Sequence, residues 1–343
     1  MDDLYLDNWI RNKIGLAIDF SLTRNAIEAY QFTALKNTLL YAKLNSTYYK
    51  TLYKEIDIED EIKSLRDISK LPLIDEETLI NYGPQMSCVS ASQISRIVTL
   101  ETSGSTGEPK RVFFTQEDQE LMVDFVHHGI APIAGEGDLF LILMPCERPG
   151  SVGDLVRIGL ERRGARTIPY GILPFDGSKD KEILQIMRDN GVDSLLATSS
   201  AIYRLAAAMT EFPPFEIKSI LLSGEYVTDE IVAATKAAWN CSVFEHYGMT
   251  ESGLGGAVAC NEHIGYHARE ADLLFEIIDP ITGEVLPDGE NGEIVFTTLS
   301  RAAMPFIRYR TGDFASIINE PCPCKSIIKR LSRVGSRKAV KGY

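Results

Sequence analysis

Apolar residues recur at near-helical spacing between residues 8 and 55, where they alternate with polar side chains. The recurring positions are Ala26, Ile27, Tyr30, Leu35, Leu39, Ala42 and Leu44. This spacing predicts amphipathic helices that pack one face against the rest of the protein. The stretch from Ser64 to Leu79 carries Pro72 and charged turns, which predicts a short helix-and-loop connector.

From residue 96 to about residue 247, short apolar runs alternate with helical patterns. The strand candidates beyond residue 100 are Leu139–Met144, Arg166–Pro169, Val192–Ala197, Ile217–Leu222 and Cys241–Glu245. The helix candidates are Val152–Arg163 after Ser151, Glu182–Asn190 before Gly191, and Asp229–Trp239 after Thr228. This alternation predicts a largely parallel sheet that binds ligands beyond the carboxyl ends of its strands.

The pattern changes after residue 254, where helical periodicity is lost. Two apolar runs, Leu273–Ile278 and Glu293–Leu299, flank a turn-rich stretch, and a third run, Phe314–Ile318, follows them. This predicts a small antiparallel β subdomain. The expected fold is therefore α/β, with a helical cap (1–95), a parallel-sheet βαβ core (96–254), a β subdomain (255–331) and a final segment (332–343).

Composition narrows the range of partners. The chain has 343 residues, 45% of them hydrophobic, and a net charge of −13. A sizeable core is expected, and the charge argues against nucleic acid or an anionic membrane as a partner. The acidic N-terminus lacks signal-peptide features, and the run Leu139–Met144 is too short to span a bilayer. We expect a cytoplasmic protein that binds small molecules, with a homodimer as an open alternative.

The stretch from Thr102 to Lys110 combines hydroxyl groups, glycines and a lysine. Its candidate ligand-binding residues are Ser103, Gly104, Ser105, Thr106, Gly107 and Lys110. It follows the apolar run Arg96–Leu100, so it is expected to be a loop leaving a buried strand. Several charge-assisted hydrogen bonds of about 1.5–3 kcal/mol each would hold a polyphosphate there. Pro109 excludes the common P-loop pattern, and a Ser/Gly-rich surface turn is the alternative.

A second group of polar residues follows the strand candidates. The run Cys241–Glu245 ends in His246-Tyr247-Gly248-Met249-Thr250-Glu251. Here Tyr247 could stack on a base, Thr250 could donate to a phosphate, and Glu251 could hold Mg²⁺. A buried tyrosine and a solvated glutamate are the alternative.

Two further turns complete this group. Ser223-Gly224-Glu225 follows the run Ile217–Leu222, so it is expected at the same sheet edge. In Arg308-Tyr309-Arg310-Thr311-Gly312-Asp313, the carboxylate of Asp313 follows a predicted turn and could accept both hydroxyls of a ribose. A simple β-turn with a satisfied aspartate is the alternative.

Four strings in this order, TSGSTGEPK, YGMTE, YRTGD and RLSRVGSR, resemble the motifs of the acyl-adenylate-forming (AMP-binding) superfamily. The resemblance is to its phenylacetate–CoA ligase branch, and it covers nearly the whole chain. It implies ATP-dependent activation of an aromatic or arylacetic acid as an acyl-adenylate, with release of pyrophosphate. Capture of the acyl group by coenzyme A would follow.

The resemblance also implies residue roles. The catalytic residues would be Thr250 at the α-phosphate, Glu251 at Mg²⁺, and Lys110. The nucleotide-binding residues would be Ser103, Gly104, Ser105, Thr106, Gly107, Gly224, Glu225, Tyr247, Gly248, Asp313 and Arg337. The segments 145–151 and 198–203, the second a predicted turn, are both expected at strand ends, and from this position we expect them to line the acyl pocket.

Four cysteine and histidine residues form a separate candidate site: Cys260, His267, Cys322 and Cys324. Thiolate and imidazole in this number suit tetrahedral Zn²⁺, which would brace the β subdomain. Members of the resembled branch can carry such a structural zinc. His263 competes with His267 as a ligand, and four ordinary buried or surface residues are the alternative.

The chain stops at Tyr343, where the resembled family continues into a small mobile C-terminal domain, so we expect a chain that lacks this domain. Its usual hinge acid pair is also not evident, since Lys338-Ala339 follows Arg337. Two rival functions therefore stay open. One is adenylation with a different acceptor, a deazaflavin or a protein, and the other is a nucleotide-binding core without turnover.

Overall fold

The computed structural model describes residues 5–17, 20–100 and 109–335, and the chain divides into two compact units. Unit one holds residues 1–121, 250–253 and 267–343, and unit two holds residues 122–249 and 254–266. The four-part division predicted from the sequence stays a prediction. Of the helices in the described part of the chain, none combines the length and apolar character needed to cross a bilayer.

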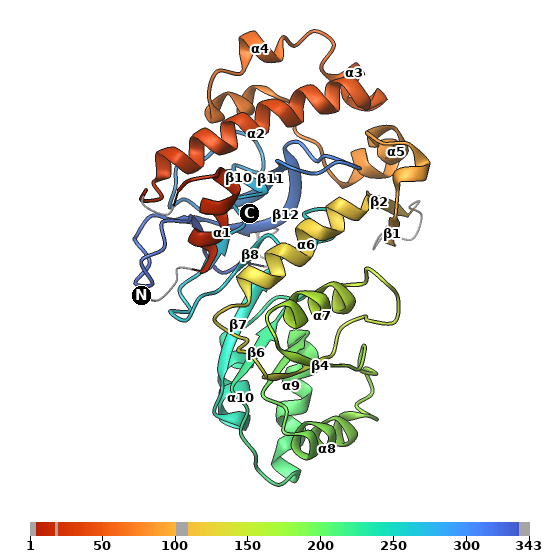
Figure 1. The fold of residues 1–343 in the computed structure, drawn as a ribbon, viewed down its shortest axis with the longest axis vertical. Helices are drawn as coiled ribbons and strands as arrows, with labels where there is room; N and C mark the ends of the chain where they lie inside the picture. Colours follow the sequence, from red (N-terminus) through yellow and green to blue (C-terminus); the bar gives the residue numbers. More distant parts are fainter. Residues whose placement is uncertain (1–4, 18–19, 101–108, 336–343) are drawn as a thin grey trace. The chain divides into compact units, whose positions relative to one another are not determined.

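Unit two is built on a mostly parallel sheet (Figure 1). Its strands are β3 (Leu139–Ile142), β4 (Arg166–Pro169), β5 (Ser194–Ala197), β6 (Ser219–Leu222), β7 (Ser242–Tyr247) and β8 (Ala257–Val258). Their order is β8-β7-β6-β5-β3-β4, with parallel pairing throughout except between β7 and β8. Leu141 pairs with Ile168 on one side and Leu195 on the other. Because all four residues of β3, β5 and β6 are buried, these strands are continuously apolar, as parallel strands covered on both faces require.

The helices of unit two follow local capping signals. They are α7 (Val152–Arg162), α8 (Asp180–Asn190), α9 (Ser199–Ala208), η3 (Met209–Glu211) and α10 (Asp229–Trp239). Gly191 ends α8 with a φ of 61°, and the Thr228 hydroxyl accepts from the Ile231 amide at the start of α10. The predicted βαβ alternation is therefore confirmed.

Helix α9 corrects one prediction. Residues 198–203 were expected to form a turn, but Thr198 is an N-cap whose hydroxyl accepts from the Ala201 amide, and the helix runs on from Ser199. Ile202, Leu205 and Ala206 are buried on one face, so apolar packing overrides the turn preference of Thr198-Ser199-Ser200.

Unit one begins with helices, as the apolar spacing predicted. These are α1 (Tyr5–Ile14), α2 (Arg24–Asn45), α3 (Thr47–Leu52), α4 (Ile58–Glu61), η1 (Leu65–Lys70), α5 (Glu76–Met86) and η2 (Ala91–Gln93). Side chains of α2 anchor it to the later part of unit one: the Tyr30 hydroxyl donates to the Ala271 carbonyl at 2.9 Å, and the Thr38 hydroxyl to the Leu299 carbonyl at 2.9 Å. Helix α6 (Gln116–Gly129) starts in unit one and continues into unit two.

The predicted antiparallel subdomain is also present in unit one. Its sheet has the order β10-β11-β12, formed by β10 (Leu273–Ile278), β11 (Gly292–Thr298) and β12 (Tyr309–Ala315). The short strands β13 (Ile317–Ile318) and β14 (Arg330–Leu331) pair with each other. The predicted fold class, a parallel-sheet α/β protein with an antiparallel subdomain, is confirmed.

Two strand predictions need correction. Asp313 does not follow a turn: it lies inside β12, beside a register shift between Glu293 and Val295 of β11. Arg96–Leu100 is a strand, but not the buried strand that was predicted. As β1 it pairs antiparallel with β2 (Lys110–Phe114) in a two-stranded sheet, and its residues alternate between half-buried and exposed. Its alternation of side chains has the period of a half-exposed strand.

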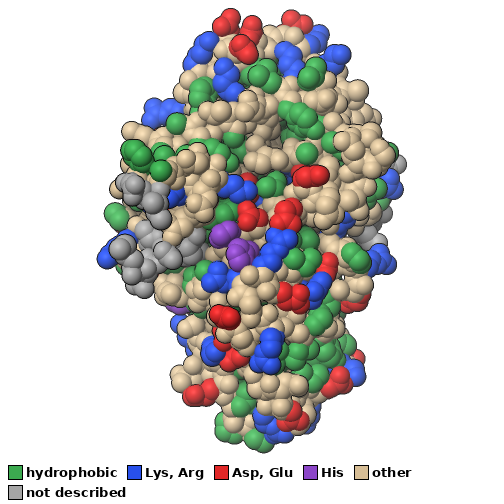
Figure 2. Space-filling model, in the orientation of Figure 1, with side chains coloured by type: hydrophobic (Ala, Val, Ile, Leu, Met, Phe, Trp, Pro, Cys, Tyr) green, Lys and Arg blue, Asp and Glu red, His purple; other side chains and the backbone are tan. Residues whose placement is uncertain are grey.

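Acidic and basic side chains are interspersed on the face drawn in Figure 2. The net charge of −13 is therefore not gathered there into a field of one sign.

Candidate active site

Lys110, the first residue of β2, lies between two carboxylates of unit one. Its Nζ atom is 2.8 Å from Oε1 of Glu251 and 2.8 Å from Oε1 of Glu76, the first residue of α5. The Lys110 side chain is 11% exposed and that of Glu251 only 1%. Burial lowers the pKa of Lys110, but Glu251 and then Glu76 outweigh it, so the pKa is raised and the ammonium form is favoured.

The carboxylate and the backbone of Glu251 are both held in place. The Tyr309 hydroxyl donates to Oε1 of Glu251 at 3.1 Å, and Arg301 donates from Nη1 to the Glu251 carbonyl oxygen. The Arg301 guanidinium lies 4.4 Å from the ring centre of Phe114 and 5.6 Å from that of Phe306. Burial lowers the pKa of Arg301 to about 10. Glu251 is therefore a preorganised, buried carboxylate.

Two other predicted residues belong to unit one. Thr250 precedes Glu251 and is half-buried, and its carbonyl accepts from the Gly253 amide at 3.0 Å, which makes a tight turn. Asp313 is buried, and its amide donates to the Thr311 hydroxyl at 3.0 Å. Gly312 has a φ of 70°, a conformation that favours glycine, and this bend within β12 precedes the predicted ribose ligand.

The remaining described residues of the predicted nucleotide site belong to unit two. Tyr247 ends β7 and is buried. Gly248 follows in a tight spot, where an added Cβ would lie 2.5 Å from the Leu254 carbonyl oxygen, so a larger residue would displace the backbone. The Glu225 carboxylate accepts from the Ser200 amide at 2.7 Å and from its hydroxyl at 2.9 Å. Gly224, before it, has a φ of 83°.

The structure therefore brings Lys110 and Glu251 together, while each of the other described site residues is placed within its own unit. Ser103, Gly104, Ser105, Thr106, Gly107 and Arg337 lie outside the described residues. Glu76, Arg301 and Tyr309 were missed as functional candidates. Tyr309 lies inside the YRTGD string. Glu76 lies in none of the four motifs, and its contact with Lys110 depends on the packing of α5 against β2.

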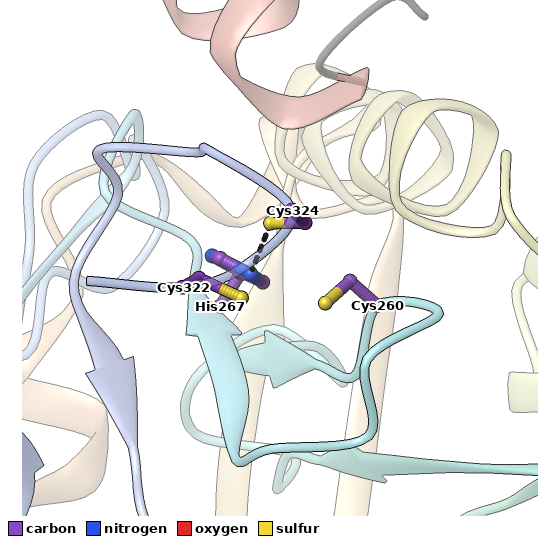
Figure 3. Close-up of side chains that lie close together, drawn as sticks. All are labelled: Cys260, His267, Cys322 and Cys324. Carbon is purple, nitrogen blue, oxygen red and sulfur yellow. Dashed lines mark hydrogen bonds between the residues drawn. The ribbon is translucent and has the colours of Figure 1, made fainter. Parts of the chain in front are cut away.

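The cysteine and histidine residues form a compact cluster (Figure 3). One ligand atom from each of Cys260, His267, Cys322 and Cys324 lies within 4.8 Å of the other three. His267 Nε2 is 3.4 Å from Cys324 Sγ. Among the described residues it is His267, and not His263, that belongs to this cluster. A three-sulfur, one-nitrogen donor set suits tetrahedral zinc, and bonds of about 2.0–2.3 Å need only a small inward movement of these atoms.

Local hydrogen bonds in unit one shape the loop that carries Cys322 and Cys324. The Lys325 amide donates to the Cys322 carbonyl at 2.8 Å, which closes a turn around Pro323. Asp7 of α1 then holds the next residues: it accepts from the Ser326 hydroxyl, and from the Ile327 amide at 3.1 Å. The Ala268 amide donates to the Lys329 carbonyl at 2.8 Å, which places the end of β9 (Tyr266–Ala268), the strand that carries His267, beside this loop.

Comparison with known proteins shows the family to which this chain belongs. The profile of the family described as AMP-binding enzyme matches residues 55–302, more than half of the chain. The chain belongs to the AMP-binding enzyme family. Phenylacetate-coenzyme A ligase of Pseudomonas putida is 31% identical over 304 residues, which cover 86% of this chain and 67% of that protein. The enzyme of the same name from Aromatoleum evansii is 29% identical over 330 residues, covering 92% of this chain and 71% of that protein.

Solved structures support the fold. 2-Hydroxyisobutyryl-CoA ligase in an open conformation, in complex with 2-HIB-AMP and CoA, superposes with a TM-score of 0.81 at 19% identity, covering 92% of this chain and 70% of that chain. The same ligase in its thioesterification state gives a TM-score of 0.82 at 20% identity, covering 92% and 69%. The predicted relationship to the phenylacetate–CoA ligase branch, and the fold it implies, are confirmed.

Proposed function

We propose that this protein is an acid–CoA ligase that forms AMP. It would activate a carboxylic acid with ATP as an acyl-adenylate, release pyrophosphate, and pass the acyl group to coenzyme A. The observation that carries the proposal is the buried Lys110–Glu251 pair, which joins the ends of two of the matched motifs at 2.8 Å. Membership of the AMP-binding enzyme family and the phenylacetate-coenzyme A ligase relatives support it.

The proposed residue roles are those that the match to the family's motifs implies. Lys110 would leave Glu251 to hold the ATP phosphates with Ser103, Ser105 and Thr106, while Thr250 would donate to the α-phosphate. Tyr247 would cover the adenine beside Gly224 and Glu225, and Asp313 would accept the ribose hydroxyls. The carboxylate of the substrate itself attacks phosphorus, so the protein needs no nucleophile and contributes positioning and charge stabilisation.

Glu251 fits a magnesium ligand. It offers carboxylate oxygens, the donor type that Mg²⁺ takes, and its present partner Lys110 has Glu76 as a second anchor. Magnesium bound there would offset the negative charge of the phosphates. The Tyr309 hydroxyl and Arg301 would keep the carboxylate and its backbone in place when Lys110 moves.

For the acid, we propose an arylacetic or other aromatic carboxylate. The support is the name of the relatives, which are phenylacetate-coenzyme A ligases from several bacteria.

The test is ATP–pyrophosphate exchange over a panel of carboxylic acids, with thioester formation measured in parallel. We expect exchange that depends on an aromatic acid, and acyl-CoA when coenzyme A is present. Exchange without thioester would move the proposal to another acceptor. Nucleotide binding with no exchange for any acid would overturn it.

We also propose that Cys260, His267, Cys322 and Cys324 hold a structural zinc ion. The donor set and its compactness support this, and Zn²⁺ would neutralise thiolates gathered within 4.8 Å. Metal analysis of freshly purified protein should find about one zinc per chain. Protein without metal, with these thiols titrating as free cysteines, would contradict the proposal.

A further inference from the structure

Glu76 belongs to no matched motif, yet it contacts the lysine of the phosphate motif. It is the first residue of α5, and its carboxylate lies 2.8 Å from Lys110 Nζ. The Asp75 side chain accepts from the Thr78 amide at 2.9 Å, so the start of α5 is fixed by a cap. Glu76 is 45% exposed, whereas Glu251 is 1% exposed. The Lys110 ammonium ion is therefore shared between a partly exposed carboxylate, Glu76, and a buried one, Glu251.

The two contacts of Lys110 have different consequences when a magnesium nucleotide binds. An ammonium ion and Mg²⁺ compete for the Glu251 carboxylate, because two cations on one carboxylate repel each other. Lys110 must therefore give up Glu251. If Glu251 were its only counter-charge, leaving it would strand a partly buried ammonium ion until a phosphate arrived, which is costly.

We propose that Glu76 is a positioning residue for Lys110. It retains the ammonium ion while Glu251 is exchanged for the magnesium nucleotide, and so lowers the metal concentration at which nucleotide binds. This inference rests on the proposed function, and it adds a residue that acts through Lys110 and touches no reacting atom. Its effect falls on binding, and the rate at saturation is left unchanged.

The substitution that tests this is Glu76→Gln, with Glu77→Gln as the matched control. Glu77 is the next residue of α5 and is exposed, so both variants lose one negative charge at nearly the same place. ATP binding is measured by equilibrium dialysis at limiting and at excess Mg²⁺. For Glu76→Gln we expect the apparent Kd at limiting Mg²⁺ to rise roughly two- to fivefold, the range of a partly exposed ion pair. Excess Mg²⁺ should restore it.

A second variant, Glu76→Asp, keeps the charge but shortens the reach, and should give a smaller shift in the same direction. The pyrophosphate exchange rate at saturating Mg²⁺ and ATP should stay close to wild type in all three variants. Equal Kd values for Glu76→Gln and Glu77→Gln would overturn the inference and leave the proposed function standing. Failure of the wild-type protein to bind ATP at any Mg²⁺ concentration would overturn both.

Discussion

The Lys110 cluster and the cysteine–histidine cluster are both compact groups of chemically active side chains, but they differ in how their charges are balanced. Lys110 is neutralised by the protein itself, through Glu76 and Glu251. The other cluster combines the sulfur atoms of Cys260, Cys322 and Cys324 with the imidazole of His267. If the three sulfur atoms are thiolates, they repel one another until a cation binds. On the proposals made above, the Lys110 cluster would open to bind a nucleotide, whereas the cysteine–histidine cluster would be closed by a metal ion.

The largest effect should come from Glu251→Gln. The amide keeps the size of the side chain but loses the charge that holds Lys110 and suits Mg²⁺, so pyrophosphate exchange should fall roughly 10³-fold. Glu290→Gln, an exposed carboxylate elsewhere in unit one, is the control and should leave exchange unchanged. Unchanged exchange for Glu251→Gln at saturating Mg²⁺ would remove Glu251 from the site.

Cys322→Ser tests the cysteine–histidine cluster. Losing one sulfur ligand should empty the metal site and lower the free energy of unfolding by about 3 kcal/mol, because metal binding is coupled to folding. Metal content and the unfolding midpoint are the measurements. Cys88→Ser is the matched control, since Cys88 is also buried in unit one but lies outside the cluster, and it should keep its metal.

Asp7→Asn should loosen the cysteine loop without removing a ligand. Asp7 accepts from Ser326 and Ile327, just after Cys324, so the variant should lose metal to a chelator about tenfold faster than wild type. The rate is followed with a coloured zinc indicator. Asp60→Asn, at an exposed position, is the control. Equal release rates for the two variants would mean that α1 does not support the metal loop.

Arg301→Met should have the smallest effect on pyrophosphate exchange. It distinguishes a role of Arg301 in positioning Glu251 from a role in the stability of the fold. The pKa of Arg301 is lowered to about 10 by burial, so the unfolded chain binds this proton more tightly and the buried charge costs stability at neutral pH. Removing the charge should leave the unfolding midpoint nearly unchanged. Loss of the hydrogen bond to the Glu251 carbonyl should slow exchange about fivefold. A large fall in the midpoint with normal exchange would contradict this.

The elements that could be predicted from the sequence are those with local signals. Asp229–Trp239 has the predicted limits, because Thr228 caps its start, and Arg166–Pro169 is a strand as predicted. Predictions were wrong where the structure of one segment depends on a neighbouring segment. Arg96–Leu100 was predicted to be a buried strand, because its antiparallel pairing with β2 leaves no mark in either segment alone.

The same division holds for the two clusters. Cys322 and Cys324 could be recognised from residue type and spacing, and His267 was chosen over His263 only by the fold. The motifs identified Lys110 and Glu251 as site residues, but they did not predict the contact between the two. Glu76 could not be predicted, because it meets Lys110 through the packing of α5 on β2, where Gly83 lies against Arg111 and an added Cβ would be 3.6 Å from its carbonyl oxygen.

The most direct measurement is a crystal structure of this protein with ATP and Mg²⁺. We predict that Lys110 leaves Glu251, keeps Glu76 within reach and contacts a phosphate, while Glu251 contacts the metal ion. A structure in which the nucleotide binds and the 2.8 Å contact between Lys110 and Glu251 is unchanged would contradict it.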